Sequence, residues 1–193
     1  MFLTVSQLTV IYDACVLYPA PLRSLLMYLA MTDLFRARWT DAIHEEWMGN
    51  VQSDSPDITR DKAERIRDLM NAHVRDCLVT GYEDLIPSLT LPDPDDRHVL
   101  AAVIRAGAGV IVTANLSDFP AETLKRYGLE ARHPDEFIHR LLDVAPAAVC
   151  GAAKKQRDSL KNPPKSVEQY LESLERQGLA QTVAALRRFA ELI

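Results

Sequence analysis

The amino-acid sequence predicts an α/β fold in which a parallel sheet carries helices on both faces. Short apolar, β-branched runs alternate with longer segments of helical spacing, a pattern typical of parallel sheets. Two of those runs are closely followed by aspartates, and ligand sites in open α/β sheets form at the carboxyl ends of strands. Residues 145–193 contain no strand-like run. They therefore predict a helical C-terminal extension to a domain formed by residues 1–144.

The first predicted strand and helix follow one another closely. Residues 8–12 (LTVIY) form an apolar, β-branched run, which predicts a buried strand. Asp13 follows at once, so its carboxylate is expected at the edge of the sheet. Pro19 and Pro21 suit the first turn of a helix. Four leucines at helical spacing give that helix its apolar face: Leu22, Leu25, Leu26 and Leu29.

A second strand and a second helix are predicted next. Residues 36–39 form the short strand, and either Thr40 or Asp41 is placed to cap the helix that follows. Glu45 and Glu46 lie about one turn into this helix. The sequence therefore puts at least one more carboxylate on a helix that could face the edge of the sheet.

Several further elements surround the middle of the chain. Residues 58–77 predict a long helix with apolar and basic faces, and residues 78–80 predict a short strand. Residues 120–127 predict a short helix, residues 130–133 an edge strand and residues 134–144 another helix. In the C-terminal extension, a basic segment precedes two predicted amphipathic helices, 166–177 and 179–192.

Residues 91–120 hold the densest group of candidate functional residues. This stretch opens with three closely spaced carboxylates, continues through a helix-like segment at 99–106 and a β-branched run at 110–113, and closes on a loop with Asn115 and Asp118. The head of a helix and the end of the next strand can meet in an open sheet. The three carboxylates are Asp93, Asp95 and Asp96.

These acids point to metal-assisted phosphodiester hydrolysis. That reaction needs an activated water and neutralisation of the charge that develops on phosphate, and paired divalent cations about 3.5–4 Å apart supply both. Mg²⁺ prefers oxygen ligands, and clustered carboxylates raise one another's pKa unless a cation is bound. The candidates near the predicted edge are Asp13, Glu46, Asp96 and Asp118.

Each acid taken alone also has an ordinary structural interpretation. Asp13 could cap a turn, and Asp93 and Asp95, on either side of a proline, are good helix-capping residues. Glu45 and Glu46 could belong to a solvated helix face. The functional interpretation depends on several acids meeting at one edge.

At these residues the chain resembles PIN-domain proteins, which include the VapC-like toxin ribonucleases. Members typically have a first strand that ends in Asp and an acid on an early helix. An Asp then heads an Ala-rich helix, and a T-x-N-x-x-D-F loop follows. The resemblance covers roughly residues 8–135. The matching motifs are VIYDACVL, IHEEW, DPDDRHVLAAVIRAGA and VIVTANLSDFP.

The resemblance implies a three-layer α/β/α sandwich with a central parallel sheet. It also implies an endoribonuclease that uses Mg²⁺ or Mn²⁺, with Asn115 as a polar neighbour of the acids. Asp93 remains an alternative to Asp96 as a metal ligand, and Glu45 an alternative to Glu46. The residues carried over as catalytic and metal-binding are Asp13, Glu46, Asp96 and Asp118.

Partners and alternatives follow from the same resemblance. A toxin of a type II toxin–antitoxin system has RNA as its substrate and a cognate antitoxin as its partner, and many such proteins form homodimers. A PIN-fold module that binds RNA or protein without cleaving it is the first alternative. A nuclease that acts on DNA is the second, because the same metal site would cleave either polymer.

Composition bears on nucleic-acid binding, on disulfide or zinc sites, and on cellular location. The net charge of −5 argues weakly against binding nucleic acid through the overall field. Three widely spaced cysteines without a CxxC pair do not support a disulfide framework or a zinc site, and fit a reducing cytoplasm. The apolar start of the chain is too short to span a bilayer. We therefore expect a cytoplasmic protein without a membrane segment.

Overall fold

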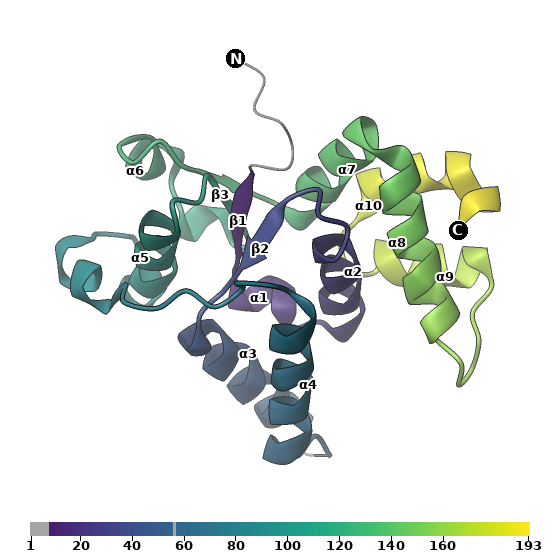
Figure 1. The fold of residues 1–193 in the computed structure, drawn as a ribbon, viewed down its shortest axis with the longest axis horizontal. Helices are drawn as coiled ribbons and strands as arrows, with labels where there is room; N and C mark the ends of the chain where they lie inside the picture. The colour runs from purple at the N-terminus through teal and green to yellow at the C-terminus, as the bar shows by residue number, and fades with distance from the viewer. Residues whose placement is uncertain (1–7, 56) are drawn as a thin grey trace.

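The central sheet has four parallel strands in the order β2-β1-β3-β4. The structure is a computed structural model that describes residues 8–55 and 57–193. The sheet lies between α5 on one side and α2 and α7 on the other (Figure 1), so the predicted three-layer α/β/α sandwich is confirmed. The strands are β1 (Thr9–Tyr12), β2 (Arg36–Arg38), β3 (Val110–Val112) and β4 (Glu130–Arg132).

The two inner strands form the centre of the hydrophobic core. In β1 and β3, Val10 pairs with Val110 and Ile11 with Ile111, and all four side chains are buried. Such unbroken apolar runs are typical of strands covered on both faces. The two edge strands have only three residues each and carry charged side chains at both ends, which discourages pairing with another sheet.

The helices of the sandwich largely match the expected segments. Capping is as predicted at α3, where the Thr40 side chain accepts from the backbone N–H of Ile43. The helix predicted at residues 134–144 is α7. The helices of this part are α1 (Ala14–Leu17), α2 (Ala20–Ala30), α3 (Asp41–Asp54), α4 (Arg60–His73), α5 (Arg97–Ala106), α6 (Ala121–Lys125) and α7 (Pro134–Val144).

Two predictions in the middle of the chain are wrong. The strand predicted at residues 78–80 is only an isolated bridge between Leu78 and Trp39, because Gly81 adopts a positive φ and turns the chain away. The helix predicted at residues 58–77 ends at His73, where the backbone becomes extended. Short 3₁₀ turns connect the later elements: η2 (Glu83–Ser88), η3 (Pro94–Asp96) and η4 (Leu116–Asp118).

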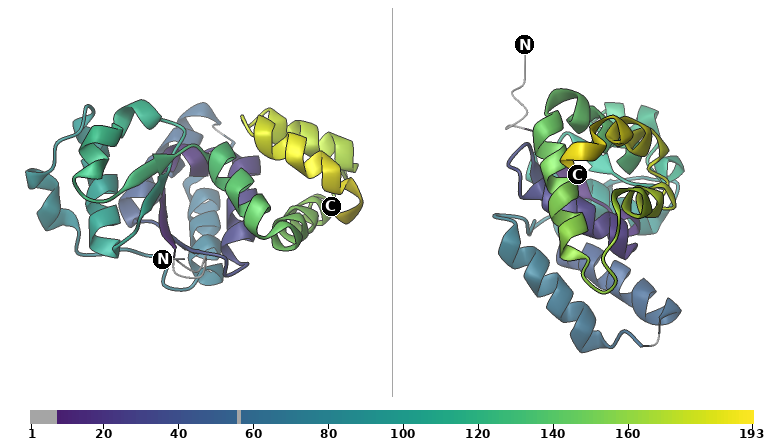
Figure 2. Two further views of the ribbon diagram at one scale, coloured as in Figure 1. Left: turned by 90° about the horizontal axis from the view of Figure 1, so that it is seen from above. Right: turned by 90° about the vertical axis from the view of Figure 1, so that its right-hand side faces the viewer.

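The C-terminal extension is helical and packs on one side of the sandwich (Figures 1 and 2). Its first helix, α8, contains the basic segment and was not predicted. A buried polar contact joins α8 to α2, because the Gln156 amide donates to the Pro21 carbonyl at 2.8 Å and accepts from Tyr170 Oη at 2.7 Å. The extension contains α8 (Pro146–Ser159), α9 (Val167–Glu175), α10 (Ala180–Leu186) and η5 (Arg187–Leu192).

The structure bears on the expectations about membrane segments and disulfides. Across residues 8–55 and 57–193, none of the helices combines the length and the apolar character that crossing a bilayer requires. Cys15, Cys77 and Cys150 are free thiols.

Candidate active site

Asp13 stands at the carboxyl end of β1 and is fixed by three donors. Its side chain is nearly fully buried, with 3% of the residue exposed. One carboxylate oxygen accepts from the backbone N–H of Ala14 at 2.7 Å, so that Asp13 caps α1. The other oxygen accepts from the Thr113 hydroxyl at 2.7 Å and from the Cys15 thiol at 3.1 Å. Asp13 is therefore a capping residue, as its position in the sequence allowed. Capping uses one carboxylate oxygen and does not exclude a functional role for Asp13.

Thr113 and Cys15 join the ends of the two central strands around Asp13. Thr113 is fully buried just after β3, and its hydroxyl also accepts from the backbone N–H of Asn115 at 3.0 Å. The Cys15 sulfur accepts from the backbone N–H of Ala114 at 3.2 Å. Burial, with the charge of Asp13, raises the pKa of the Cys15 thiol to about 12, so the thiol keeps its proton and remains a donor.

Burial also shifts the titration of Asp13. Loss of solvation raises the pKa of this carboxyl, and the nearby charge of Glu46 raises it further. The bonds from Thr113 and Cys15 act in the opposite direction, because they stabilise the charged form. The sequence reasoning did not select Thr113 or Cys15 as functional residues. The threonine of the T-x-N-x-x-D-F motif was the signal that pointed to the first of them.

Asp96 is the carboxylate whose pKa the charges of the other acids raise. It lies half-buried where η3 leads into α5. Burial raises its pKa from 3.8 to about 6, and four neighbouring carboxylates add to the shift. Carboxylates that raise one another's pKa lie within electrostatic range. The four carboxylates whose charges add to the shift at Asp96 are Asp13, Asp118, Asp93 and Glu46.

The two glutamates of α3 face different surroundings. Glu45 binds Arg60 of α4, with Nη2 and Oε1 separated by 2.7 Å. Glu46 points toward α5, where its Oε2 lies 3.5 Å from Nε2 of His98. Glu46 is therefore the glutamate that the structure places beside the other acids. The His98 side chain is 18% exposed and contacts this glutamate.

The remaining candidates lie in the two loops that flank α5 and β3. Asp93 is exposed and caps η3, where its carboxylate accepts from the backbone N–H of Asp95 at 2.8 Å. Asp118 is half-buried and accepts from the Ser117 hydroxyl at 3.3 Å. Asn115 is exposed, and the only side-chain role assigned to it rests on the family motif.

The acids suit a hard divalent cation in chemistry and charge, because they offer carboxylate oxygens and repel one another. They are not gathered into a ligand group, however. Within the part of the chain that the structure describes, no three His, Cys, Asp or Glu side chains are close enough to hold a metal ion together. The composition of the metal site therefore remains a proposal.

Comparison with known proteins supports the resemblance that the motifs indicate. A family model described as "VapC50 C-terminal domain" matches residues 134–188. "Putative ribonuclease VapC50" of Mycobacterium tuberculosis (strain ATCC 25618 / H37Rv) is 40% identical over 108 residues, which are 56% of this chain and 63% of that protein. In both comparisons the chain resembles VapC-like PIN-domain proteins. The aligned region thus spans less than two thirds of the relative's length, and no solved structure matches.

The C-terminal match covers most of the helical extension of this VapC-like chain. It begins at the first residue of α7 and ends in η5. In the structure α7 contacts both α8 and α10. The family model therefore treats α7 and the extension helices as one unit.

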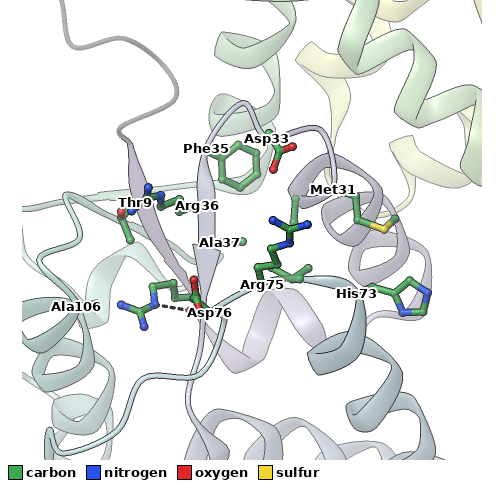
Figure 3. Close-up of a pocket in the computed structure, with 13 residues that line it drawn as sticks. Thr9, Met31, Asp33, Phe35, Arg36, Ala37, His73, Arg75, Asp76 and Ala106 are labelled. Carbon is green, nitrogen blue, oxygen red and sulfur yellow. Dashed lines mark hydrogen bonds between the residues drawn. The ribbon is translucent and has the colours of Figure 1, made fainter.

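A concave surface of the VapC-like chain lies along the outer side of β2, and its lining includes none of the predicted acids. Its volume is about 870 Å³, and Arg36 of β2 and Arg75 after α4 lie at it (Figure 3). Arg38 also lines it and donates to the carbonyls of Asp76 and Leu78. The C-terminal ends of α2, α4 and α5 contribute residues here, and cations complement helix C-termini. The arginines thus have a structural explanation.

Replacement of Asp96 by asparagine is expected to stabilise the metal-free VapC-like protein at pH 7. Because the pKa of Asp96 is raised from 3.8 to about 6 in the folded state, its ionisation opposes folding. This penalty is absent near pH 4, grows as the pH rises to 6 and is constant above. With solvent screening of a half-exposed group it amounts to about 1 kcal/mol, or a rise in Tm of about 2–4 °C.

Thermal unfolding of wild type and Asp96→Asn in EDTA, at pH 4 and at pH 7, checks this prediction. The difference between the two proteins should appear at pH 7 and largely vanish at pH 4. A variant that is less stable than wild type at pH 7 would contradict the electrostatic interpretation of this site.

Proposed function

We propose that this protein is a metal-dependent endoribonuclease and the toxin of a type II toxin–antitoxin system. The observation that carries the proposal is Asp13, a buried carboxylate at the carboxyl end of β1 that three donors fix in place. Its charge and those of Asp118, Asp93 and Glu46 also raise the pKa of Asp96. Support also comes from the 40% identity to a protein whose name includes ribonuclease. Carboxylates that raise one another's pKa cost stability unless a cation offsets their repulsion.

Asp13, Asp96 and Asp118 would hold Mg²⁺ or Mn²⁺, with Glu46 or Asp93 as a further ligand. When bound, such a cation activates water and offsets the charge that develops on the phosphate. Asp13 is the most rigid of these groups, since three donors fix its carboxylate. Ligands that are held in place before binding lose less entropy on binding.

The other candidate residues would act on the metal or on the RNA near Asp13. The half-exposed side chain of Glu46 is placed to bind metal or to orient the attacking water. Asn115 is exposed in the loop after β3 and would contact the RNA beside the scissile phosphate. Asp96 and Asp118 are half-buried, so their carboxylates stay accessible to a phosphate that approaches from solvent.

The proposal extends to partners and location. A toxin of this kind would act on RNA in the cytoplasm, and a segment of the cognate antitoxin would block the acids. A homodimer is part of the same proposal, with the C-terminal helices as a candidate surface. Co-purification of the chain with the product of a neighbouring gene would test the antitoxin.

An RNA-cleavage assay with purified protein tests the nuclease proposal. With Mg²⁺ or Mn²⁺ present we expect endonucleolytic products from RNA and little cleavage of a single-stranded DNA of the same sequence. EDTA should abolish the products, and restored metal should return them. Cleavage that persists in EDTA would contradict metal dependence. Equal cleavage of DNA would mean that the substrate is not restricted to RNA.

A binding module that does not cleave remains the second candidate. It is favoured by one observation, namely that within residues 8–55 and 57–193 the acids do not form a closed ligand group. In that case the protein would bind RNA or Mn²⁺ without forming cleavage products. Parallel measurements of RNA binding and cleavage separate the two functions.

A further inference from the structure

His98 connects the two helices that carry Glu46 and Asp96. It lies in the first turn of α5, two residues after Asp96, and its Nε2 atom is 3.5 Å from Oε2 of Glu46 on α3. The imidazole is the more buried partner, with 18% of its side chain exposed against 43% for the glutamate. A side chain packed in this way is the fixed member of the pair, and the glutamate is the mobile one.

Glu46 has little else to hold it. In the described residues no hydrogen bond to its carboxylate is found, and the one basic side chain recorded beside it is His98, at 3.5 Å. A free glutamate side chain has several rotamers, and ordering it costs up to about 2 kcal/mol. Its neighbour Glu45 shows the alternative, since Arg60 holds that carboxylate on the side of α4. The contact with His98 therefore decides where the Glu46 carboxylate stands.

The ring nitrogens indicate which group donates. An ionised carboxylate only accepts, so Nε2 must carry the proton that faces Glu46. The other nitrogen, Nδ1, is buried and has no partner among the residues described. A protonated Nδ1 would leave a buried N–H without an acceptor, which is costly. The arrangement therefore directs the Nε2–H of His98 at the glutamate.

From these contacts we propose that His98 is a positioning residue, which holds Glu46 beside Asp96 so that both carboxylates serve one metal site. The proposal rests on the nuclease function proposed above. The 3.5 Å separation is longer than an ordinary hydrogen bond, and such contacts often shorten when a site is loaded. Residues that orient metal ligands typically affect metal affinity or activity 10–100-fold.

Two variants of His98 test the proposal. His98→Leu removes the donor and should weaken Mn²⁺ binding, measured by titration calorimetry, by about 10-fold. It should lower kcat for RNA by a similar factor and leave KM unchanged, because the RNA contacts remain. His98→Gln keeps an N–H donor and should stay within about threefold of wild type, a rescue that a purely packing role would not give.

A double-mutant cycle with Glu46→Gln separates positioning from general destabilisation. If His98 acts through Glu46, His98→Leu should change Mn²⁺ affinity little once Glu46 is already replaced. Equal losses in both backgrounds, or no loss in either, would overturn the proposal. Wild type that binds Mn²⁺ but does not cleave RNA would defeat the nuclease function alone, since the cycle can still be measured by Mn²⁺ affinity.

Discussion

Replacement of Asp13 by asparagine is expected to lower the rate of RNA cleavage by about 1,000-fold, or about 4 kcal/mol of transition-state stabilisation. Asp13 is the central and most rigid of the acids, bound by Ala14, Thr113 and Cys15. Asparagine has the same size but carries no charge, so it would be a much weaker ligand for a divalent cation. Single-turnover cleavage of a defined RNA with saturating Mg²⁺ measures the effect.

The loss should come from chemistry and not from unfolding. Asparagine caps helices as well as aspartate, so the start of α1 should be preserved. Because burial raises the pKa of Asp13, the neutral amide should fold at least as readily as the charged carboxylate. Wild type and variant should therefore have similar Tm values in EDTA.

A matched control is available on α4. Asp61 is an exposed carboxylate in the first turn of that helix, and Asp61→Asn should cleave RNA at the wild-type rate. Cleavage by Asp13→Asn at the wild-type rate would indicate a contaminating nuclease or a site elsewhere. A preparation of the variant that has been freed of contaminating nuclease and still cleaves at the wild-type rate would remove Asp13 from the proposed active site.

The sequence predicts the parts of this molecule that depend on local chemistry. The strands at residues 8–12 and 110–113 are recognisable because both faces of each are buried, which produces continuous apolar runs. The acids at the ends of these strands follow from strand direction alone. The positions of these acids along the chain were therefore predictable from the sequence.

Contacts between elements were not predictable in the same way. The choice between Glu45 and Glu46 depends on how α3 is rotated about its axis, and the sequence offers a carboxylate on either side. Arg60 binds one of them and His98 faces the other. Cys15 is a similar case, because only the structure shows its thiol bound to Asp13.

The C-terminal extension is another case in which the sequence does not predict contacts between elements. Helix α8 was missed because its segment is basic and begins with small residues, so its apolar periodicity is weak. The helix is held by tertiary contacts instead, among them the buried bond from Gln156 to the Pro21 carbonyl. Packing overrides weak local preference in such a segment.

Replacement of Asp135 by alanine is expected to destabilise the protein by about 3 kcal/mol, which would lower its Tm by roughly 6–12 °C. Asp135 lies in the first turn of α7 and is 5% exposed. Its carboxylate accepts from the backbone N–H groups of Gln181 at 2.9 Å and Thr182 at 2.8 Å. These belong to the first turn of α10, where Leu179 gives no side-chain cap.

The size of the effect follows from what alanine leaves behind. Two backbone N–H groups at the start of α10 would lose their acceptor, and Thr182 is fully buried. A buried donor without a partner costs about 1–3 kcal/mol. The charge of Asp135 also lies at the N-terminal ends of both α7 and α10, where a negative group is favourable. Asp135→Asn retains one acceptor oxygen and should lose roughly half as much stability.

Asp143 provides the control on the same helix. It is exposed near the end of α7, and its carboxylate lies 3.5 Å from Nδ1 of His139. Asp143→Ala should therefore change stability by about 0.5 kcal/mol or less. Thermal unfolding of the three proteins checks the prediction. Equal Tm values for Asp135→Ala and Asp143→Ala would mean that α10 stays in place without its cap. A large difference would make the extension part of the cooperative fold, because one buried carboxylate on α7 would then stabilise a helix that begins 45 residues later in the chain.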